Sequence, residues 1–427
     1  MKYRRILGFM LVLVFAVLFS LSVSCEGEKS IVTPALNVVA KDSYVAKSCL
    51  ASDTVTFDAD DFEKALNLSK VSSITVTRLP DRTEGVLKLG NVEISEGQTV
   101  SRANIGFMNY VFFGEGTNAG SFDFTANGEV HELECKVFSL KHKNEKPIAN
   151  AKNETEASTY KNVNLYGKLD GYDPDGDRII YEVVKTTQNG ILKLNKDGEY
   201  VYKPTGNFVG RDNFKYVVVD KYGNYSSTAT VSISVDMQGT SMVFSDLNDG
   251  KYHVAAISLT ESGIMPTVEI GGEYYFEPDS EVSRIDFLVM SMKNLGIKAE
   301  AGADTTVFAD DSQIPNDYKK YVNTAIRKGI VSGKIDADGN IVFAPNDKIT
   351  RAEAAVILSR MTELESPVLK PVFADENTIP AWAESAVCSL AYIGVMENEN
   401  GYVSVNDTLK KGECVYMLYN LNKYVNG

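Results

Sequence analysis

Hydrophobic and polar residues alternate through much of the first half of the chain. Between about residues 30 and 235, apolar positions recur at every second residue in short runs, and Gly, Asp and Asn separate the runs. This spacing is typical of strands that bury one face and expose the other. The clearest runs cover residues 131–140 and 229–235. We therefore predict that this half consists of β-strands.

The strand-rich half contains two copies of one pattern. GVLKL at 85–89 corresponds to GILKL at 190–194, and SFDF at 121–124 corresponds to NFKY at 213–216. Several short strands in about 100 residues indicate a β-sandwich. A polar segment that ends in Pro147 lies between the copies. We therefore predict two all-β sandwich domains, which cover residues 30–142 and 143–237.

The pattern changes after Met242, where the spacing of apolar residues becomes helical. A period of about 65 residues appears there, and such a period indicates repeated structural units. Phe-x-Asp motifs open the units at 244–246, 308–310 and 373–375. A glycine follows the first helix of each unit, at Gly263, Gly329 and Gly394. We predict three helical units, at residues 242–300, 305–366 and 370–424.

The second helix of the central unit begins in the sequence ITRAE at 349–353. Thr350 predicts an N-cap, and Glu353 completes a capping box three residues later. Ser283 and Asp286 occupy the same positions in the first unit, whereas Lys410 replaces the capping hydroxyl in the third. We therefore predict that the second helix of each unit begins directly after these positions.

A cation follows the capping position in all three units, at Arg284, Arg351 and Lys411. The helix dipole makes a cation at this first helical position unfavourable by roughly 0.3–1 kcal/mol, so capping does not explain it. Free N–H groups at a helix start attract anions, and a guanidinium recognises carboxylates. We interpret the cations as an anion-binding feature. The alternative is a solvated Arg351 that pairs with its own Glu353.

The three units resemble S-layer homology domains over about residues 242–424, most closely through ITRAE and GIVSG (329–333) in the central unit. The resemblance implies an all-α, pseudo-threefold triplet whose grooves bind a pyruvylated secondary cell-wall polysaccharide. The groove of Arg351 keeps the family motifs, whereas Gly412 and Lys411 depart most from them. By this resemblance the polymer-binding residues are Arg351, Thr350, Glu353, Gly329, Ile330, Val331, Gly333, Arg284, Ser283, Gly263, Lys411, Gly394 and Trp382.

Aromatic residues near the start of each first helix are candidates for the walls of these grooves. They are Trp382 in the third unit, Tyr318 in the second and Tyr252 in the first. An aromatic ring at such a position either stacks on a sugar or packs in the core. The sequence leaves both interpretations open.

The second β copy resembles bacterial cadherin-like and immunoglobulin-like repeats, through DPDGD at 173–177, GIL at 190–192 and the segment 208–214. The first copy resembles them more loosely, and the resemblance concerns the fold alone. Asp173, Asp175 and Asp177 alternate in this motif, so their carboxylates are candidate calcium ligands. Asp212 or Asp220 could add a fourth ligand. The alternative is a solvated turn.

The N-terminus is typical of a secretory signal peptide at residues 1–24. Basic residues 1–5 precede the apolar run 6–21, and small residues precede Cys25. We expect an exported protein at the cell wall or S-layer, on the extracellular surface; lipidation of Cys25 is the alternative to simple cleavage. No later segment predicts an integral membrane protein. Export permits a Cys49–Cys135 disulfide, and buried thiols are the alternative.

Charge and composition exclude several classes of function. The net charge is −14 with no basic domain, which argues against a nucleic-acid partner. Three histidines and the lack of a CxxC pair argue against zinc, which leaves calcium as the one candidate cofactor. No catalytic motif stands out, so we predict a non-enzymatic, wall-anchored surface protein. The alternatives are an adhesin whose β-repeats bind a host or neighbouring-cell ligand, and a wall-anchored hydrolase with its site in the first β domain.

Overall fold

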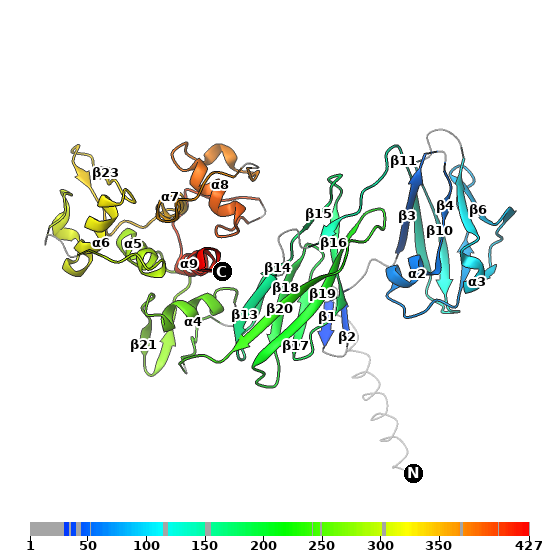
Figure 1. Cartoon of the computed structure of the whole chain (residues 1–427), viewed down its shortest axis with the longest axis horizontal. Helices are drawn as coiled ribbons and strands as arrows, with labels where there is room; N and C mark the ends of the chain where they lie inside the picture. The colour runs from blue at the N-terminus through cyan, green and yellow to red at the C-terminus, as the bar shows by residue number, and fades with distance from the viewer. Residues whose placement is uncertain are drawn as a thin grey trace, which may run out of the picture. The chain divides into compact units, whose positions relative to one another are not determined.

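The computed structural model describes residues 30–33, 36–39, 44–51, 53–113, 118–149, 155–240, 242–247, 250–300, 305–367, 370–399 and 401–426. The expected signal peptide and Cys25 lie outside these residues. The chain separates into two compact units: one covers residues up to 157, 166–206 and 210–234, and the other covers 158–165, 207–209 and 235–427. β-strands dominate the first unit and helices the second, which confirms the change of pattern near Met242 (Figure 1).

Two sheets form the first β region. The five-stranded sheet has the order β3 (Tyr44–Leu50), β11 (Leu133–Leu140), β10 (Ala119–Ala126), β5 (Ser73–Arg78), β8 (Thr99–Ser101). The four-stranded sheet has the order β4 (Val55–Thr56), β9 (Met108–Phe112), β6 (Gly85–Leu89), β7 (Val92–Glu93). Phe122 and Phe124 alternate with half-buried Ser121 and Asp123 in β10 and are fully buried in the core. β1 (Ser30–Thr33) and β2 (Leu36–Val39) pair with each other, outside both sheets.

The first β region also contains helices that the strand pattern did not predict. The helix α2 (Ala59–Leu66) follows Asp58, whose N–H donates to Asp61 Oδ2 at 2.7 Å. Phe62 lies on the inner face of α2 and is fully buried. A second, short helix is α3 (Arg102–Ile105). The all-strand interpretation is therefore wrong here, and the Asp58/Asp61 pair, three residues apart, is the capping signal that it overlooked.

The second β region has a similar layered organisation. A four-stranded sheet has the order β13 (Thr155–Tyr160), β20 (Ala229–Asp236), β19 (Gly210–Asp220), β16 (Ile179–Lys185). A three-stranded sheet has the order β14 (Leu165–Lys168), β18 (Glu199–Pro204), β17 (Gly190–Leu194). β12 (Ile148–Ala149) pairs with β15 (Gly171–Tyr172). The polar segment 143–147 has no regular structure and separates the two regions.

The glycines of the two matching motifs have the same packing role. Gly85 begins β6 and Gly190 begins β17. A Cβ atom on Gly85 would lie 2.6 Å from the Tyr110 ring, and one on Gly190 would lie 2.1 Å from the Tyr202 ring. Both tyrosines are fully buried. The predicted correspondence therefore has a physical basis, because each tyrosine needs a residue without a side chain beneath its ring.

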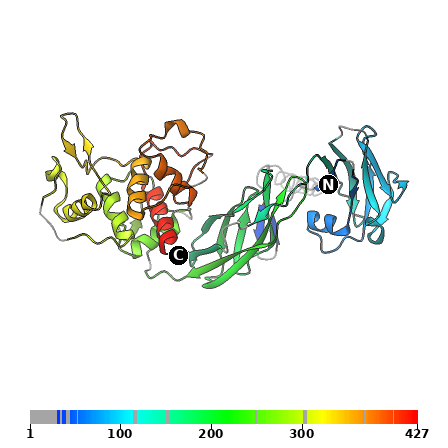
Figure 2. The ribbon, with the colours of Figure 1, turned by 45° about the horizontal axis from the view of Figure 1, so that its top comes forward.

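In the described part of the second compact unit the α-helices form three pairs, one pair in each predicted repeat. They are α4 (His253–Glu261) with α5 (Arg284–Asn294), α6 (Asn316–Arg327) with α7 (Arg351–Thr362), and α8 (Glu384–Tyr392) with α9 (Lys411–Asn426). α5 contacts both α7 and α9, so the second helices of the repeats lie together at the centre (Figures 1 and 2). The first helix of each repeat packs against the second helix of another, as α4 does on α9 and α8 on α7. One core is thus shared by all three repeats.

The prediction of an all-α triplet is wrong in detail, because short hairpins lie between the helices. β21 (Val268–Ile270) pairs with β22 (Glu273–Tyr275), and β23 (Lys334–Ile335) pairs with β24 (Ile341–Val342). Gly271 and Gly272 form the turn of the first hairpin with φ values of 64° and 87°. Residues with a side chain rarely adopt this backbone conformation. Two 3₁₀ turns, Asp311–Gln313 and Glu376–Thr378, follow the Phe-x-Asp motifs of the second and third repeats.

The aspartate of each Phe-x-Asp motif holds the loop that precedes the second helix. Asp310 accepts hydrogen bonds from the N–H groups of Phe343, at 2.8 Å, and Ala344, at 2.7 Å. Ala344 has a φ of 58°, so the carboxylate stabilises an unusual backbone conformation. Asp246 and Asp375 make the same pair of bonds in their own repeats. The motif that marked the repeats in sequence is therefore a structural clamp.

The sequence left open whether Cys49 and Cys135 form a disulfide, and the structure contradicts that interpretation. β11 pairs with β3 in a register that places Cys135 opposite Val45 and Cys49 opposite Ser139. A separation of four residues along a strand is about 13 Å, whereas a disulfide needs Cα atoms within about 7 Å. Both residues are free thiols, as are Cys388 and Cys414. Burial raises the pKa of the Cys135 thiol, which makes it a poor nucleophile.

Candidate functional site

The first N–H groups of the three second helices are already hydrogen-bonded. Those of Arg351 and Ala352 each donate at 2.9 Å, to the carbonyl oxygens of Asp407 and Val405. The next, of Glu353, donates to Thr350 Oγ1 at 3.2 Å, within the complete capping box that the sequence predicted. The expectation of a free, anion-attracting helix start at α7 is therefore wrong.

The same contacts link each repeat to another. The Arg284 N–H donates to Asp347 O at 2.9 Å, from the first repeat to the second, as Arg351 does from the second to the third. The Lys411 N–H donates to Ser280 O at 2.8 Å, from the third repeat to the first. We call these three junctions seams and name each by its cation. Every seam therefore uses the backbone of two repeats.

The Arg351 guanidinium belongs to its seam and is not a solvated side chain. It donates from Nε to Val403 O at 2.9 Å and from Nη2 to Glu397 O at 2.7 Å. Nη1 pairs with the carboxylate of Glu413 in the third repeat. The side chain is only 10% exposed. The sequence suggested that Arg351 binds an external anion or pairs with Glu353. The carboxylate that pairs with it belongs instead to Glu413 of the third repeat.

Arg284 makes the equivalent contacts in the first seam. Nε donates to Phe343 O at 3.1 Å, and Nη1 lies 3.7 Å from Glu353 Oε1. The guanidinium also lies over the Phe343 ring, with its carbon 5.4 Å from the ring centre. Burial lowers the pKa of Arg284, and the nearby carboxylates of Glu353 and Asp347 oppose that shift. This cation, too, is neutralised inside the protein.

Lys411 differs from the two arginines. Its ammonium lies 4.9 Å from the centre of the Phe276 ring, and no carboxylate of the described residues forms an ion pair with it. Asp286 occupies the position of Glu353 and Glu413, but it is one methylene shorter, and its Oδ2 accepts from the hydroxyl of its own cap, Ser283, at 2.5 Å. Burial lowers the pKa of Lys411.

The glycine-rich motif of the central repeat is structural. Gly329 ends α6 at a φ of 69°, and Gly263 and Gly394 do the same in their repeats, at 66° and 74°. Ile330 and Val331 are 2% and 4% exposed, so their side chains lie in the core and cannot contact a polymer, contrary to expectation. A Cβ atom on Gly333 would lie 2.6 Å from the Phe308 ring.

The aromatic candidates divide into two kinds. Trp382 is 61% exposed, so the interpretation of core packing is wrong for it. Tyr318 and Tyr252 are partly buried against the core. The Tyr252 ring covers the start of α9, where a Cβ atom on Gly412 would lie 2.5 Å from it. Gly412, which departs from the family motif in the sequence, is therefore required by an aromatic ring from another repeat.

The aspartates of the DPDGD motif do not converge. Asp173 Oδ1 accepts from the N–H groups of Asp175, at 2.9 Å, and Asp177, at 3.2 Å. Asp175 instead accepts from the Glu145 N–H at 2.6 Å, and Asp177 pairs with Lys221 at 2.6 Å. Two other candidates bind local backbone N–H groups: Asp212 those of Gln188 and Asn189, and Asp220 those of Tyr222 and Asn224. Within the described ranges no group of three His, Cys, Asp or Glu residues is arranged to hold a metal.

One observation keeps calcium as a proposal for this loop. Asp173 is 8% exposed, and its Oδ2 has no hydrogen-bond partner among the described residues; the same is true of the buried Asp170 Oδ2. A buried carboxylate oxygen without a partner is costly, and a bound cation would remove that cost. We therefore expect millimolar calcium to raise the melting temperature of the protein by a few degrees.

The calcium prediction is tested by thermal unfolding of the chain with and without calcium. Asp173→Asn should abolish the shift. Asp197→Asn is a suitable control, because Asp197 lies in an exposed turn of the same β region. An equal shift in the Asp173 variant, or no shift in the parent, would contradict the proposal.

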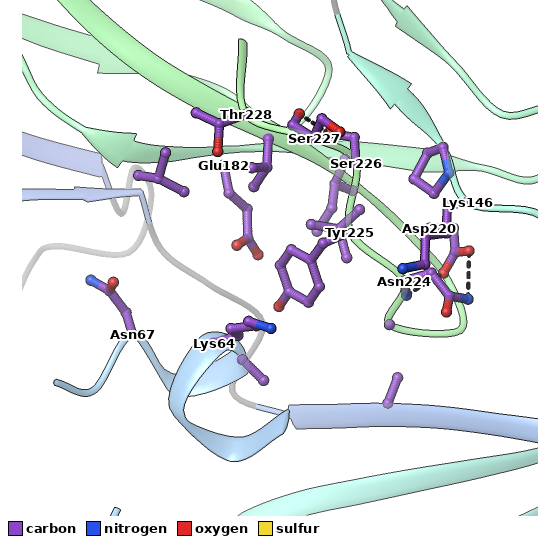
Figure 3. A pocket seen from close by; sticks show the side chains of 18 of the residues that line it. Lys64, Asn67, Lys146, Glu182, Asp220, Asn224, Tyr225, Ser226, Ser227 and Thr228 are labelled. Atoms are coloured by element: carbon purple, nitrogen blue, oxygen red, sulfur yellow. Dashed lines mark hydrogen bonds between the residues drawn. The ribbon is translucent and has the colours of Figure 1, made fainter. Parts of the chain in front are cut away.

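The first compact unit contains a pocket with acidic residues in its lining. Its lining includes Asp61 and Glu63 of α2 and Glu182 of β16. Figure 3 shows Lys64 and Asn67 on one side, with Glu182 and Tyr225 facing them. Asp61 pairs with Lys47, and Glu63 pairs with Arg102, so a cation neutralises each of these two lining carboxylates. Arg102 lowers the pKa of Glu63, the opposite of what a general acid needs.

Two family models match segments of the chain. A model of the bacterial cadherin-like domain matches residues 144–237, and a model of the S-layer homology domain matches residues 307–355. The chain contains a bacterial cadherin-like domain followed by an S-layer homology domain. The S-layer homology match lies in the second repeat, the one that the sequence marked as closest to the family. The cadherin-like match ends at the residue predicted for the second β domain.

Several known proteins are similar to parts of the chain. An amylopullulanase of Thermoanaerobacterium thermosulfurigenes is 27% identical over 258 residues, which are 58% of this chain and 13% of the relative. A surface-layer 125 kDa protein of Lysinibacillus sphaericus is 26% identical over 42% of this chain and 15% of its own length. A cellulosome-anchoring protein of Acetivibrio thermocellus is 28% identical over 38% of this chain and 36% of its own length. The chain thus spans only a small part of these relatives.

The S-layer homology domain and these relatives indicate a location at the cell surface, as the sequence predicted. Among the described residues, no helix combines the length and the apolar character needed to cross a bilayer. These matches support a surface protein that is anchored to the cell wall.

Proposed function

We propose that the chain is a non-enzymatic surface protein, held non-covalently to a pyruvylated secondary cell-wall polymer by three S-layer homology units in a pseudo-threefold arrangement. The match of the central unit to that family carries the proposal. The flanking units repeat its aspartate clamp and its helix-start bonds, which supports treating all three as one kind of unit.

Local contacts must supply the attraction, because protein and polymer are both negative. The chain carries a net charge of −14, so long-range electrostatics oppose association with an anionic polymer. Two features of the helical units suit a charged sugar. Trp382 offers an exposed ring for stacking, and Lys411 offers a cation without an ion-pair partner in the described residues.

We infer that this anchor serves to display the β domains at the cell surface. The cadherin-like match supports a display or adhesive role for residues 144–237. An adhesin that binds a neighbouring-cell ligand is thus an elaboration of the same proposal. An adhesin would bind a defined ligand in addition to the cell wall, and this binding would not depend on the wall polymer.

The hydrolase alternative draws support only from the names of relatives such as the amylopullulanase, of which this chain spans 13%. The paired carboxylates of α2 favour a structural role for the acidic residues of the first β region. Incubation of the purified protein with wall glycans and starch should release no reducing sugar. Turnover above that of a heat-inactivated sample would contradict the non-enzymatic proposal.

The anchoring proposal is tested with the full exported chain and purified cell walls. We expect the protein to sediment with intact walls, and to stay in the supernatant after hydrogen fluoride has removed the secondary polymer from the peptidoglycan. An unrelated acidic secreted protein serves as the control for trapping. Equal retention by intact and stripped walls would overturn the proposal.

A further inference from the structure

We propose that the pocket lined by α2, β16 and β19 is a binding site for a short neutral oligosaccharide, separate from the helical repeats that anchor the chain. All of its lining residues belong to the first compact unit, and its volume is about 940 Å³. Pockets that hold small organic ligands measure about 300–1,000 Å³, so this one has room for several sugar rings. The inference goes beyond the anchoring proposal and does not depend on it.

The floor of the pocket is an apolar patch on the outer face of a sheet. β16 pairs with β19 so that Ile180 lies opposite Val219 and Glu182 opposite Val217, and all four residues line the pocket. The earlier residues on the same face of β19 are polar: Arg211, Asn213 and Lys215. The outer face of this strand therefore becomes apolar only at the pocket. Ligand pockets combine such an apolar lining with a few polar groups.

An aromatic ring and hydrogen-bonding side chains surround this floor. Figure 3 shows Tyr225 projecting into the pocket near Glu182, with Asn67 on the opposite side. The exposed residues Ser227 and Thr228 follow Tyr225 in the lining. A pyranose ring has an apolar face of C–H groups and an edge of hydroxyl groups. It can therefore stack on a tyrosine ring while amide and hydroxyl side chains bind its edge.

Asn67 is a polar side chain that the fold leaves available to a ligand. It follows the last residue of α2 in the left-handed conformation, with a φ of 54°, and its backbone N–H donates to Lys64 O at 3.3 Å. Its side-chain amide makes no hydrogen bond to any of the described residues. A planar amide donates and accepts hydrogen bonds at the same time, which suits neighbouring hydroxyl groups of a sugar.

The charges of the lining favour a neutral ligand. Lys64 and Lys146 line the pocket together with Glu182, so charges of both signs are present and offset one another. The two lining carboxylates of α2, Asp61 and Glu63, are each paired with a cation. Cleavage of a glycosidic bond requires two carboxyl groups that flank it, so these pairings favour binding without hydrolysis. A neutral ligand also distinguishes this pocket from the helical repeats, for which we propose an anionic polymer.

The first test measures the binding of neutral oligosaccharides to the full exported chain by titration calorimetry. The probes are cellotetraose, maltotetraose and tetra-N-acetylchitotetraose, and we expect at least one of them to bind. Asn67→Gly should lower that affinity about fivefold or more, the scale for loss of a hydrogen bond. Glycine also adopts the left-handed conformation after a helix, so this variant should keep the melting temperature of the parent.

The matched control for this variant is Asn207→Gly. Asn207 is also an exposed asparagine in the left-handed conformation, with a φ of 61°, and it does not line the pocket. Its replacement should leave the affinity for the oligosaccharide unchanged. Equal affinity of the Asn67 and Asn207 variants would contradict the proposed role of the Asn67 amide.

The second test concerns the aromatic ring. Tyr225→Ala should weaken oligosaccharide binding about tenfold or more, whereas Tyr225→Phe keeps the ring and should bind almost like the parent. Binding of none of the three probes to the parent would overturn the proposal. Binding that Asn67→Gly and Tyr225→Ala both leave unchanged would also overturn it, because the sugar would then lie elsewhere. Retention by intact cell walls tests the anchoring proposal separately, and none of these variants should change it.

Discussion

Replacing Arg351 with alanine should lower the free energy of unfolding of the helical repeats by about 3 kcal/mol or more. The change leaves the Glu413 carboxylate without its cation and removes the donors of two carbonyl oxygens in the third repeat. Removing one partner of a buried ion pair costs about 3–5 kcal/mol, because the other charge stays buried. Urea denaturation of the full chain, followed by helical circular dichroism, measures the effect.

The matched control is Arg327→Ala. Arg327 also pairs with a carboxylate, Glu300, at 2.9 Å, but both side chains are about half exposed. An exposed ion pair contributes about 0–1 kcal/mol, so this variant should unfold almost like the parent. If the two variants lose equal stability, Arg351 is not the lock that its contacts indicate.

Replacing Asp310 with alanine should cost about 2–4 kcal/mol. The N–H groups of Phe343 and Ala344 would lose their acceptor in a buried loop. Each unsatisfied buried group costs about 1–3 kcal/mol, and the positive φ of Ala344 would lose the contact that holds it. Urea denaturation gives the stability, and hydrogen exchange should become faster at these two amides.

Asp336→Ala is the control for this second prediction. Asp336 also accepts two backbone hydrogen bonds, from Asp338 and Asn340, but it lies in an exposed hairpin turn where water replaces the lost acceptor. The free energy of unfolding of this variant should therefore stay close to that of the parent. Unchanged exchange at Phe343 and Ala344 in the Asp310 variant would show that the loop does not depend on this carboxylate.

The sequence predicted those features that depend on neighbouring residues. The caps at Thr350 and Ser283, the glycines that end the first helices and the two matching GxLKL strands all form as expected. Each of these features is determined by residues that are close in the sequence, so residue propensities and spacing are enough to predict it. The helix α2 was also encoded locally, by Asp58 and Asp61, and a strand-only interpretation overlooked it.

The partners of the seam cations could not be predicted in this way. Arg351 and Glu413 are 62 residues apart, and their pairing depends on how the repeats close on one another. The register that separates Cys49 from Cys135 depends likewise on β3 and β11 running in parallel. A cation repeated at the same position suggested a ligand, but it equally marks a contact that every repeat makes with the next. The sequence contains both possibilities, and only the tertiary contacts distinguish them.

The closed circuit of helix-start bonds has a consequence for how the repeats fold. In a tandem array each module meets only its chain neighbours, and its stability is roughly a sum over modules and junctions. Here the Lys411 N–H of the last repeat donates to Ser280 of the first, so removal of any repeat would strand donors in one neighbour and acceptors in the other. The three repeats should therefore fold as a single cooperative unit. A protein with fewer or more repeats would need a different contact between its first and last repeats.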